Sequence, residues 1–159
     1  MNKLSYKIDK EQKDPYNDNF RVVIDDKDTD YYFDVAALEI SNSEEGVFPM
    51  LVCGCGYMGC MGKYVRVKLT PTEVIWEKFY DSYADDNSSE EDELKEVELT
   101  KTWNEGVKEF IIKPPLKFDR KEYASLIKNL LSELPKYEKA LYTYKDCIES
   151  YKKGDRFRM

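Results

Sequence analysis

Hydrophobic and polar residues alternate in short stretches along much of the chain, as they do in β-strands with one buried face. In Lys63–Leu69, valine or leucine occupies every second position, with aromatic or basic residues between them. Thr70, Pro71 and Thr72 then favour a turn, and residues 73–80 return as a second strand. The pattern predicts a β-hairpin across this region.

Three other apolar stretches predict further strands: Phe20–Ile24, residues 47–53 and residues 107–112. The last stretch is stopped by two consecutive prolines, which cannot donate to a sheet. Residues 34–40 predict a short helix with Asp34 as its N-cap.

The last third of the chain predicts two longer helices. Asp119 and Glu122 form a capping box at the start of the first helix, and Pro135 separates it from the second. The apolar positions of the two helices recur at helical spacing: Tyr123, Leu126, Ile127, Leu130, Leu131, Leu134, Tyr137, Leu141, Tyr144, Cys147, Ile148 and Tyr151. Strands followed by helices predict an α+β fold, an antiparallel sheet of short strands and hairpins with C-terminal helices packed on one face. Residues 1–159 are expected to form a single domain.

The composition favours a globular, acidic protein of 159 residues with a formal net charge of −7. That charge argues against nucleic acid and anionic membranes as partners and favours a basic protein. The N-terminal residues lack the apolar core of a signal peptide, and no apolar run is long enough to cross a bilayer. We therefore expect a cytoplasmic protein, in which thiols stay reduced.

Residues 51–62 hold three of the four cysteines and four of the seven glycines. Glycine is costly inside a strand or helix, so this crowding predicts tight turns at Gly54, Gly56, Gly59 and Gly62. The turns would bring the thiols of Cys53, Cys55 and Cys60 close together, and Cys147 is the one cysteine left to join them.

The cysteines allow three interpretations. Zinc could be held by Cys53, Cys55, Cys60 and Cys147, or by the first three with a carboxylate or water. Alternatively the thiols pack under the glycine turn, or they form a disulfide or redox centre. The chain contains no histidine, which excludes Cys-His and Ser-His-Asp catalysis, and no catalytic residue is assigned.

Residues 81–98 carry nine acidic residues and one lysine, a composition typical of an exposed loop. Such a loop either makes no contacts or docks a basic partner. The acidic side chains available for docking are Asp85, Asp86, Glu90, Glu91, Asp92 and Glu93.

Asp26, Asp28 and Asp30 have the spacing with which a calcium-binding loop begins. That loop requires a glycine at its sixth position and a glutamate at its twelfth, where this chain has Tyr31 and Ala37. The aspartates are therefore interpreted as a hairpin turn.

The order of these features resembles a family of small bacterial cytoplasmic proteins that have no established activity. In that family an apolar strand leads into a Cys-x-Cys-Gly-x-x-Gly-Cys-x-Gly loop, a strand pair follows, and a Phe-Asp-x-x-x-Tyr segment opens the last helix. The matching residues are Leu51 and Val52, residues 53–62, Val74, Ile75 and Trp76, and Phe118, Asp119 and Tyr123. The resemblance implies a shared fold and cysteine loop, and it implies no reaction.

These features favour a non-enzymatic protein-binding module of the immunity or inhibitor type, because the chain is small and acidic and lacks a catalytic group. A zinc-binding metalloprotein and a thiol redox protein are the alternatives. No cofactor is assigned other than zinc in the first alternative.

Overall fold

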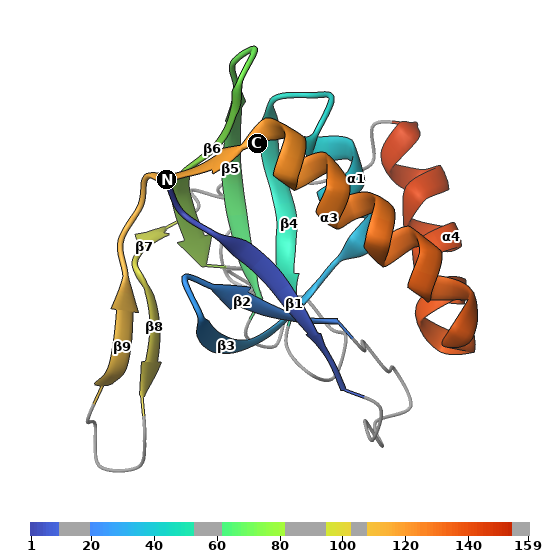
Figure 1. Cartoon of the computed structure of the whole chain (residues 1–159), viewed down its shortest axis with the longest axis horizontal. Helices are drawn as coiled ribbons and strands as arrows, with labels where there is room; N and C mark the ends of the chain where they lie inside the picture. Colours follow the sequence, from blue (N-terminus) through green and yellow to red (C-terminus); the bar gives the residue numbers. More distant parts are fainter. Residues whose placement is uncertain (10–19, 53–61, 82–94, 103–107, 154–159) are drawn as a thin grey trace, which may run out of the picture.

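The computed structural model describes residues 1–9, 20–52, 62–81, 95–102 and 108–153. These residues form an antiparallel sheet with helices packed against it, which confirms the predicted α+β class (Figure 1).

The main sheet has the strand order β1-β2-β3-β4-β5-β6-β10, and β7 pairs with the second half of β6. Its strands are β1 (Leu4–Ile8), β2 (Phe20–Ile24), β3 (Lys27–Phe33), β4 (Gly46–Val52), β5 (Lys63–Leu69), β6 (Glu73–Asp81), β7 (Glu96–Val97) and β10 (Leu116–Asp119). A separate two-stranded sheet contains β8 (Leu99–Thr102) and β9 (Lys108–Ile112). Neighbours in the main sheet are mostly consecutive in sequence, so short turns can join antiparallel strands.

The predicted hairpin is confirmed as β5 and β6, which pair from Lys63 with Asp81 to Leu69 with Val74. Val65, Val67 and Trp76 on its inner face are at most 1% exposed. The pairing shifts by one residue between Arg66 and Val67, an irregularity that the alternation of residue types does not reveal.

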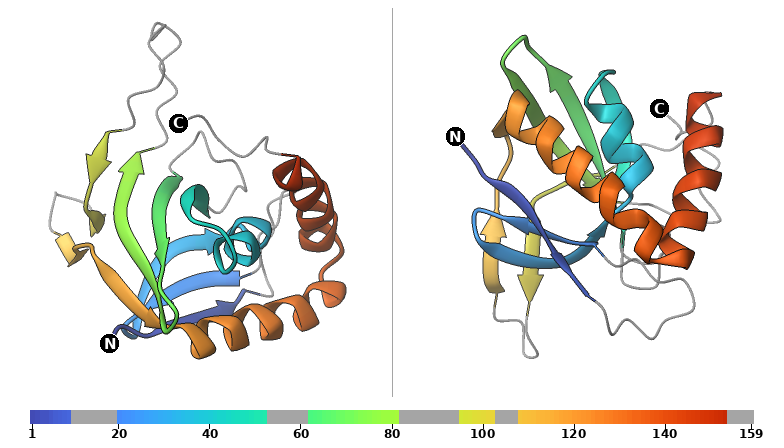
Figure 2. Two further views of the ribbon diagram at one scale, coloured as in Figure 1. Left: turned by 90° about the horizontal axis from the view of Figure 1, so that it is seen from above. Right: turned by 45° about the vertical axis from the view of Figure 1, so that its right-hand side comes forward.

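The sheet curls until the chain beside β1 meets β10 (Figure 2). The Asn2 backbone N–H donates to the Lys117 carbonyl at 2.8 Å, and the Lys117 N–H donates to Asn2 Oδ1 at 2.8 Å. The curvature creates a concave face, and helix α1 (Val35–Ser41) lies within it (Figure 2, left). Ala36, Ala37 and Leu38 of this helix are fully buried as a result.

Helices α3 (Arg120–Glu133) and α4 (Glu138–Lys152) follow β10 and are separated by a short 3₁₀ turn, Leu134–Lys136, that contains Pro135. The predicted apolar positions of both helices pack into or against the core. Only Ala140 and Tyr151 of α4 are buried, so α4 is the more lightly packed of the two. Among the described residues, no helix has the length and apolar character needed to cross a membrane.

The two helix N-termini differ from each other. Asp34 caps α1 as predicted, because its Oδ1 accepts a hydrogen bond from the Ala37 N–H at 3.0 Å. Asp119 lies at the N-cap of α3, but its side chain makes no capping hydrogen bond, so the predicted capping box is wrong. Asp119 is still paired with Glu73 in the sheet, and the N–H of the first helical residue, Arg120, donates to the Thr72 carbonyl.

A chain of buried hydrogen bonds joins the sheet to two helices. Trp76 Nε1 donates to the Tyr123 hydroxyl at 3.3 Å, and that hydroxyl lies 2.6 Å from Ser41 Oγ. Ser41 Oγ donates to the Leu38 carbonyl at 2.6 Å, so its remaining role is to accept from Tyr123. Each hydroxyl proton therefore has one acceptor. The hydrogen bonds hold β6, α3 and α1 in fixed positions relative to one another.

Candidate functional site

Most of the site residues predicted from the sequence lie outside the described part of the chain. They are Cys53, Cys55, Cys60, Gly54, Gly56, Gly59, Asp85, Asp86, Glu90, Glu91, Asp92 and Glu93. Gly62 is described and is buried immediately before β5. Cys147 is described and is half-buried on α4. In the described ranges, no group of three or more carboxylate or thiol residues is arranged to hold a metal ion.

A pocket of about 180 Å³ lies where α4 faces α1 and the ends of the central strands. Its walls are mostly apolar, formed by Phe20, Phe33, Val35, Pro49, Val52 and Ala140. Its polar groups come from Asp34, Thr143, Tyr144, Cys147 and Tyr151. An apolar pocket with a few converging polar groups has the usual composition of a ligand site.

Asp34 places a carboxylate in this pocket. Tyr151 Oη donates to Asp34 Oδ2 at 2.6 Å, while the Ala37 N–H binds Oδ1. Burial raises the pKa of the Asp34 carboxyl above its ordinary value, and the hydrogen bonds from Tyr151 and Ala37 act in the opposite direction. Burial and the neighbouring Asp34 carboxylate also raise the pKa of Tyr151, so its hydroxyl stays a neutral donor.

A second tyrosine of α4 forms an equivalent contact two turns earlier. Tyr144 Oη donates to Glu39 Oε1 at 2.5 Å and lies 3.2 Å from Glu39 Oε2. Burial, followed by the hydrogen bond to Glu39, raises the pKa of Tyr144. Because α4 buries few residues, these two tyrosine–carboxylate contacts contribute to holding it on α1, and both tyrosines line the pocket.

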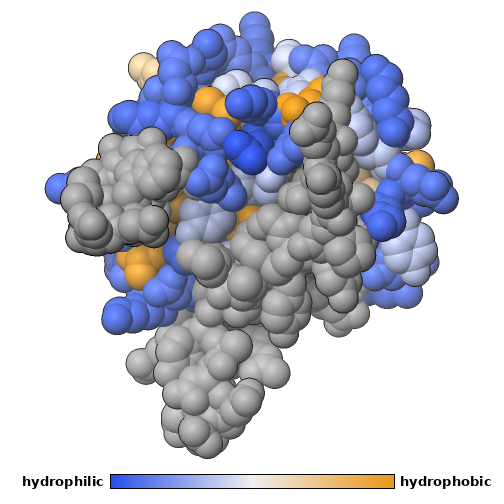
Figure 3. Space-filling model, turned by 90° about the horizontal axis from the view of Figure 1, so that it is seen from below, coloured by the Kyte–Doolittle hydropathy of each residue, from blue (hydrophilic) through white to orange (hydrophobic). Residues whose placement is uncertain are grey.

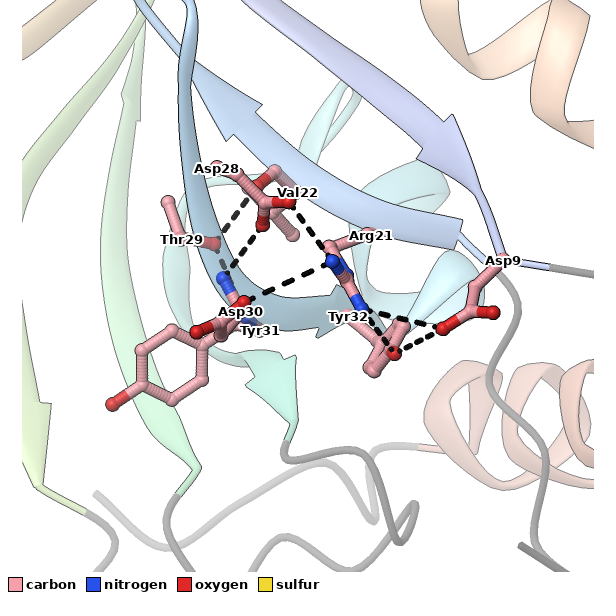
Figure 4. Close-up of polar contacts among 8 residues, drawn as sticks. All are labelled: Asp9, Arg21, Val22, Asp28, Thr29, Asp30, Tyr31 and Tyr32. Carbon is pink, nitrogen blue, oxygen red and sulfur yellow. Dashed lines mark hydrogen bonds and ion pairs between the residues drawn. The ribbon is translucent and has the colours of Figure 1, made fainter. Parts of the chain in front are cut away.

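A second polar cluster surrounds Arg21 on β2 (Figure 4). Its guanidinium lies 2.9 Å from Asp28 Oδ2, 3.3 Å from Asp9 Oδ2 and 3.8 Å from Asp30 Oδ1. The Tyr32 hydroxyl accepts from Arg21 at 3.3 Å and donates to Asp9 at 2.8 Å. The hydrogen bonds to Tyr32 and Asp28 raise the pKa of Arg21, which keeps the guanidinium charged.

The Arg21 cluster lies where β2 and β3 pair irregularly, between Arg21 and Val23. Asp30 takes a left-handed backbone conformation there, with φ of 63°, and its N–H donates to Asp28 Oδ1 at 3.0 Å. The predicted aspartate-rich turn is therefore shorter than expected, since Asp28 and Asp30 belong to β3. Their carboxylates form ion pairs with the Arg21 guanidinium, so the cluster stabilises the irregular pairing of β2 and β3.

Comparison of the chain with protein-family models, with curated proteins and with solved structures finds no match in any of the three. The family resemblance stated from the sequence stays a prediction.

The Asp34 contacts predict how stability depends on pH. A raised pKa in the folded state means that stability is highest below the unfolded carboxyl pKa of about 4 and falls as pH rises through the folded pKa. Asp34→Asn keeps a good N-cap and removes this titration. We expect wild-type stability, relative to this variant, to decrease from about pH 4 upward and then to level off. Urea unfolding across that range measures the difference, and parallel curves for the two proteins would contradict the account.

Proposed function

We propose that this protein is a non-enzymatic protein-binding module of the inhibitor or immunity type, with a basic protein as its partner. The proposal is supported first by the distribution of charge. Residues 81–98 contain nine acidic residues and one lysine, so the excess of negative over positive side chains in this segment is larger than the net charge of −7 of the whole chain. The acidic excess is therefore concentrated in one segment, and such a field accelerates the capture of a partner of opposite charge.

The two ends of the acidic segment are fixed to the sheet, and this observation carries the proposal. Asp81 ends β6 and Glu96 begins β7, which pairs with β6. The Asp81 N–H donates to the Lys95 carbonyl at 2.9 Å, so the segment leaves and rejoins the sheet at one place. Lys63 pairs with Asp81 at 2.9 Å and Lys78 with Glu96 at 3.6 Å. These two lysines form ion pairs with acidic residues at the two ends of the segment. The sequence between Asp81 and Glu96 contains six further carboxylates.

The described surface offers little apolar area to a partner. Among the described residues, the large hydrophobic side chains that are exposed are Met1, Ile111 and Tyr142. Seen from below, described hydrophobic residues form small separate patches among hydrophilic ones (Figure 3). A surface of this kind suits association guided by charge better than an obligate hydrophobic interface.

The partner proposal predicts that capture depends on the acidic segment. In the test variant, Asp85, Asp86, Glu90, Glu91, Asp92 and Glu93 are changed to the matching amides. Immobilised wild-type protein is expected to capture a basic protein from a lysate of its source, and the variant is expected to lose it. With the purified partner, the association rate should fall about tenfold or more at low salt.

A matched control changes six exposed acidic residues elsewhere to amides: Asp26, Glu44, Glu122, Glu138, Asp146 and Glu149. The control has the same net charge as the test variant and should retain the partner. If every captured protein bound the test variant and the control equally well, the acidic residues of the segment would have no special role in binding and the proposal would be wrong.

A zinc-binding protein is the second candidate, favoured by the position of Cys147. Cys147 lines the same pocket as Val52, the last described residue before the cysteine-glycine segment. Because Cys53 follows Val52 directly in the sequence, this shared pocket supports the proposal that Cys147 is the fourth ligand beside Cys53, Cys55 and Cys60.

The zinc candidate predicts close to one equivalent of zinc in protein produced in zinc-replete medium, measured by elemental analysis. Cys147→Ser should lower that content, because it removes one of four thiolate ligands. Less than about a tenth of an equivalent in the wild type would exclude a zinc site built on these cysteines.

A further inference from the structure

Among the described residues that line the pocket between α1 and α4, several carry aromatic rings and one carries a carboxylate. Phe20, Phe33, Tyr144 and Tyr151 contribute the rings, and Asp34 contributes the carboxylate. The faces of aromatic rings attract cations, and Phe20 and Phe33 are 1% exposed, so little water screens this wall of the pocket. Rings and a carboxylate in one enclosure therefore favour a positively charged ligand over a neutral or negative one.

The Asp34 carboxylate retains capacity for another donor. A carboxylate has about four acceptor positions. The N–H groups at the start of α1 and the Tyr151 hydroxyl use only part of that capacity. Burial disfavours the charged form of Asp34, and a bound cation would compensate for the lost hydration.

The size and walls of the pocket limit the ligand further. A volume of about 180 Å³ slightly exceeds the roughly 150 Å³ cavity that accommodates benzene in another protein. Val35, Val52 and Ala140 give the pocket an aliphatic side that suits a short hydrocarbon stem. A lysine or arginine side chain has a suitable size for a pocket of this volume.

We propose that this pocket binds a small organic cation, with an ammonium or guanidinium head at Asp34 and an apolar stem against the aliphatic wall. The ligand is either a free amine or the end of a basic side chain from another protein. The inference does not require the partner proposed above, because the pocket and the acidic segment use different residues.

The test is an NMR titration of the full chain with n-butylammonium, and with n-butanol as the neutral probe of similar size. Butylammonium is expected to shift the amide signals of Asp34, Ala37 and Tyr151 and to bind at least tenfold more tightly than butanol. Equal affinity for the two probes, or shifts confined to residues away from the pocket, would overturn the proposal.

Two variants locate the binding. Asp34→Asn keeps the helix cap and should weaken butylammonium binding at least tenfold. Ala140→Leu fills the pocket from the opposite wall and should also abolish the shifts, so the proposal stays testable if one variant fails to fold. Asp146→Asn, on an exposed part of α4, is the matched control and should bind within about twofold of wild type. Unchanged binding in a folded Asp34→Asn or Ala140→Leu protein would contradict the site.

A second titration distinguishes the two sources of the cation. Nα-acetyl-lysine-methylamide presents the same ammonium on a peptide backbone. Binding comparable to that of butylammonium identifies a protein side chain as a fitting occupant, and binding of butylammonium alone identifies a free amine. The chain with a neutralised acidic segment should bind butylammonium as wild type does, which separates this proposal from the partner proposal.

Discussion

The fold depends on the buried hydrogen-bond chain from Trp76 through Tyr123 to Ser41. Its groups come from β6, α3 and α1, elements that are far apart in the sequence. Burying an indole N–H or a hydroxyl without a partner costs about 1–3 kcal/mol, so the three groups stabilise the core only in this arrangement. Burial raises the pKa of the Tyr123 hydroxyl, which keeps it in the neutral form that donates to Ser41. These hydrogen bonds therefore determine where α1 lies within the curled sheet.

The position of α1 in turn determines the pocket. Asp34 caps this helix and Glu39 lies within it. Their carboxylates accept hydrogen bonds from two tyrosines of α4, Tyr151 and Tyr144 respectively. The lightly packed α4 is thus located by polar contacts to α1, with apolar contacts adding to them. The carboxylate proposed to bind a cation is also the cap that starts α1, so structural and binding roles meet in one residue.

Local sequence patterns predicted the elements whose contacts are local. Alternating valines located the hairpin of β5 and β6, and Asp34 was identified as a cap because the N–H that it accepts from, that of Ala37, lies three residues away. The Asp119 capping box was wrong because β10 runs directly into α3 and Asp119 is still paired with Glu73 in the sheet. Local pattern therefore does not show when a sheet contact replaces a cap.

The candidate sites could not be predicted in the same way. The pocket joins residues from position 20 to position 151, and no short motif links them. The Arg21 cluster depends on a bulge that places Asp28 and Asp30 beside Arg21, and their spacing alone suggested a turn. The cysteines and the acidic segment were visible in the sequence because each is a dense local composition. Their roles stay proposals, since most of these residues lie outside the described ranges.

The most direct test of the central claim is a double-mutant cycle between Tyr123→Phe and Ser41→Ala, measured by urea unfolding. If one buried hydrogen-bond chain holds α1 against α3 and β6, the two substitutions should be coupled by about 1 kcal/mol or more. The double variant should then lose less stability than the two single variants together. Additive losses, with a coupling below about 0.3 kcal/mol, would show that the hydroxyls act independently and would contradict the account.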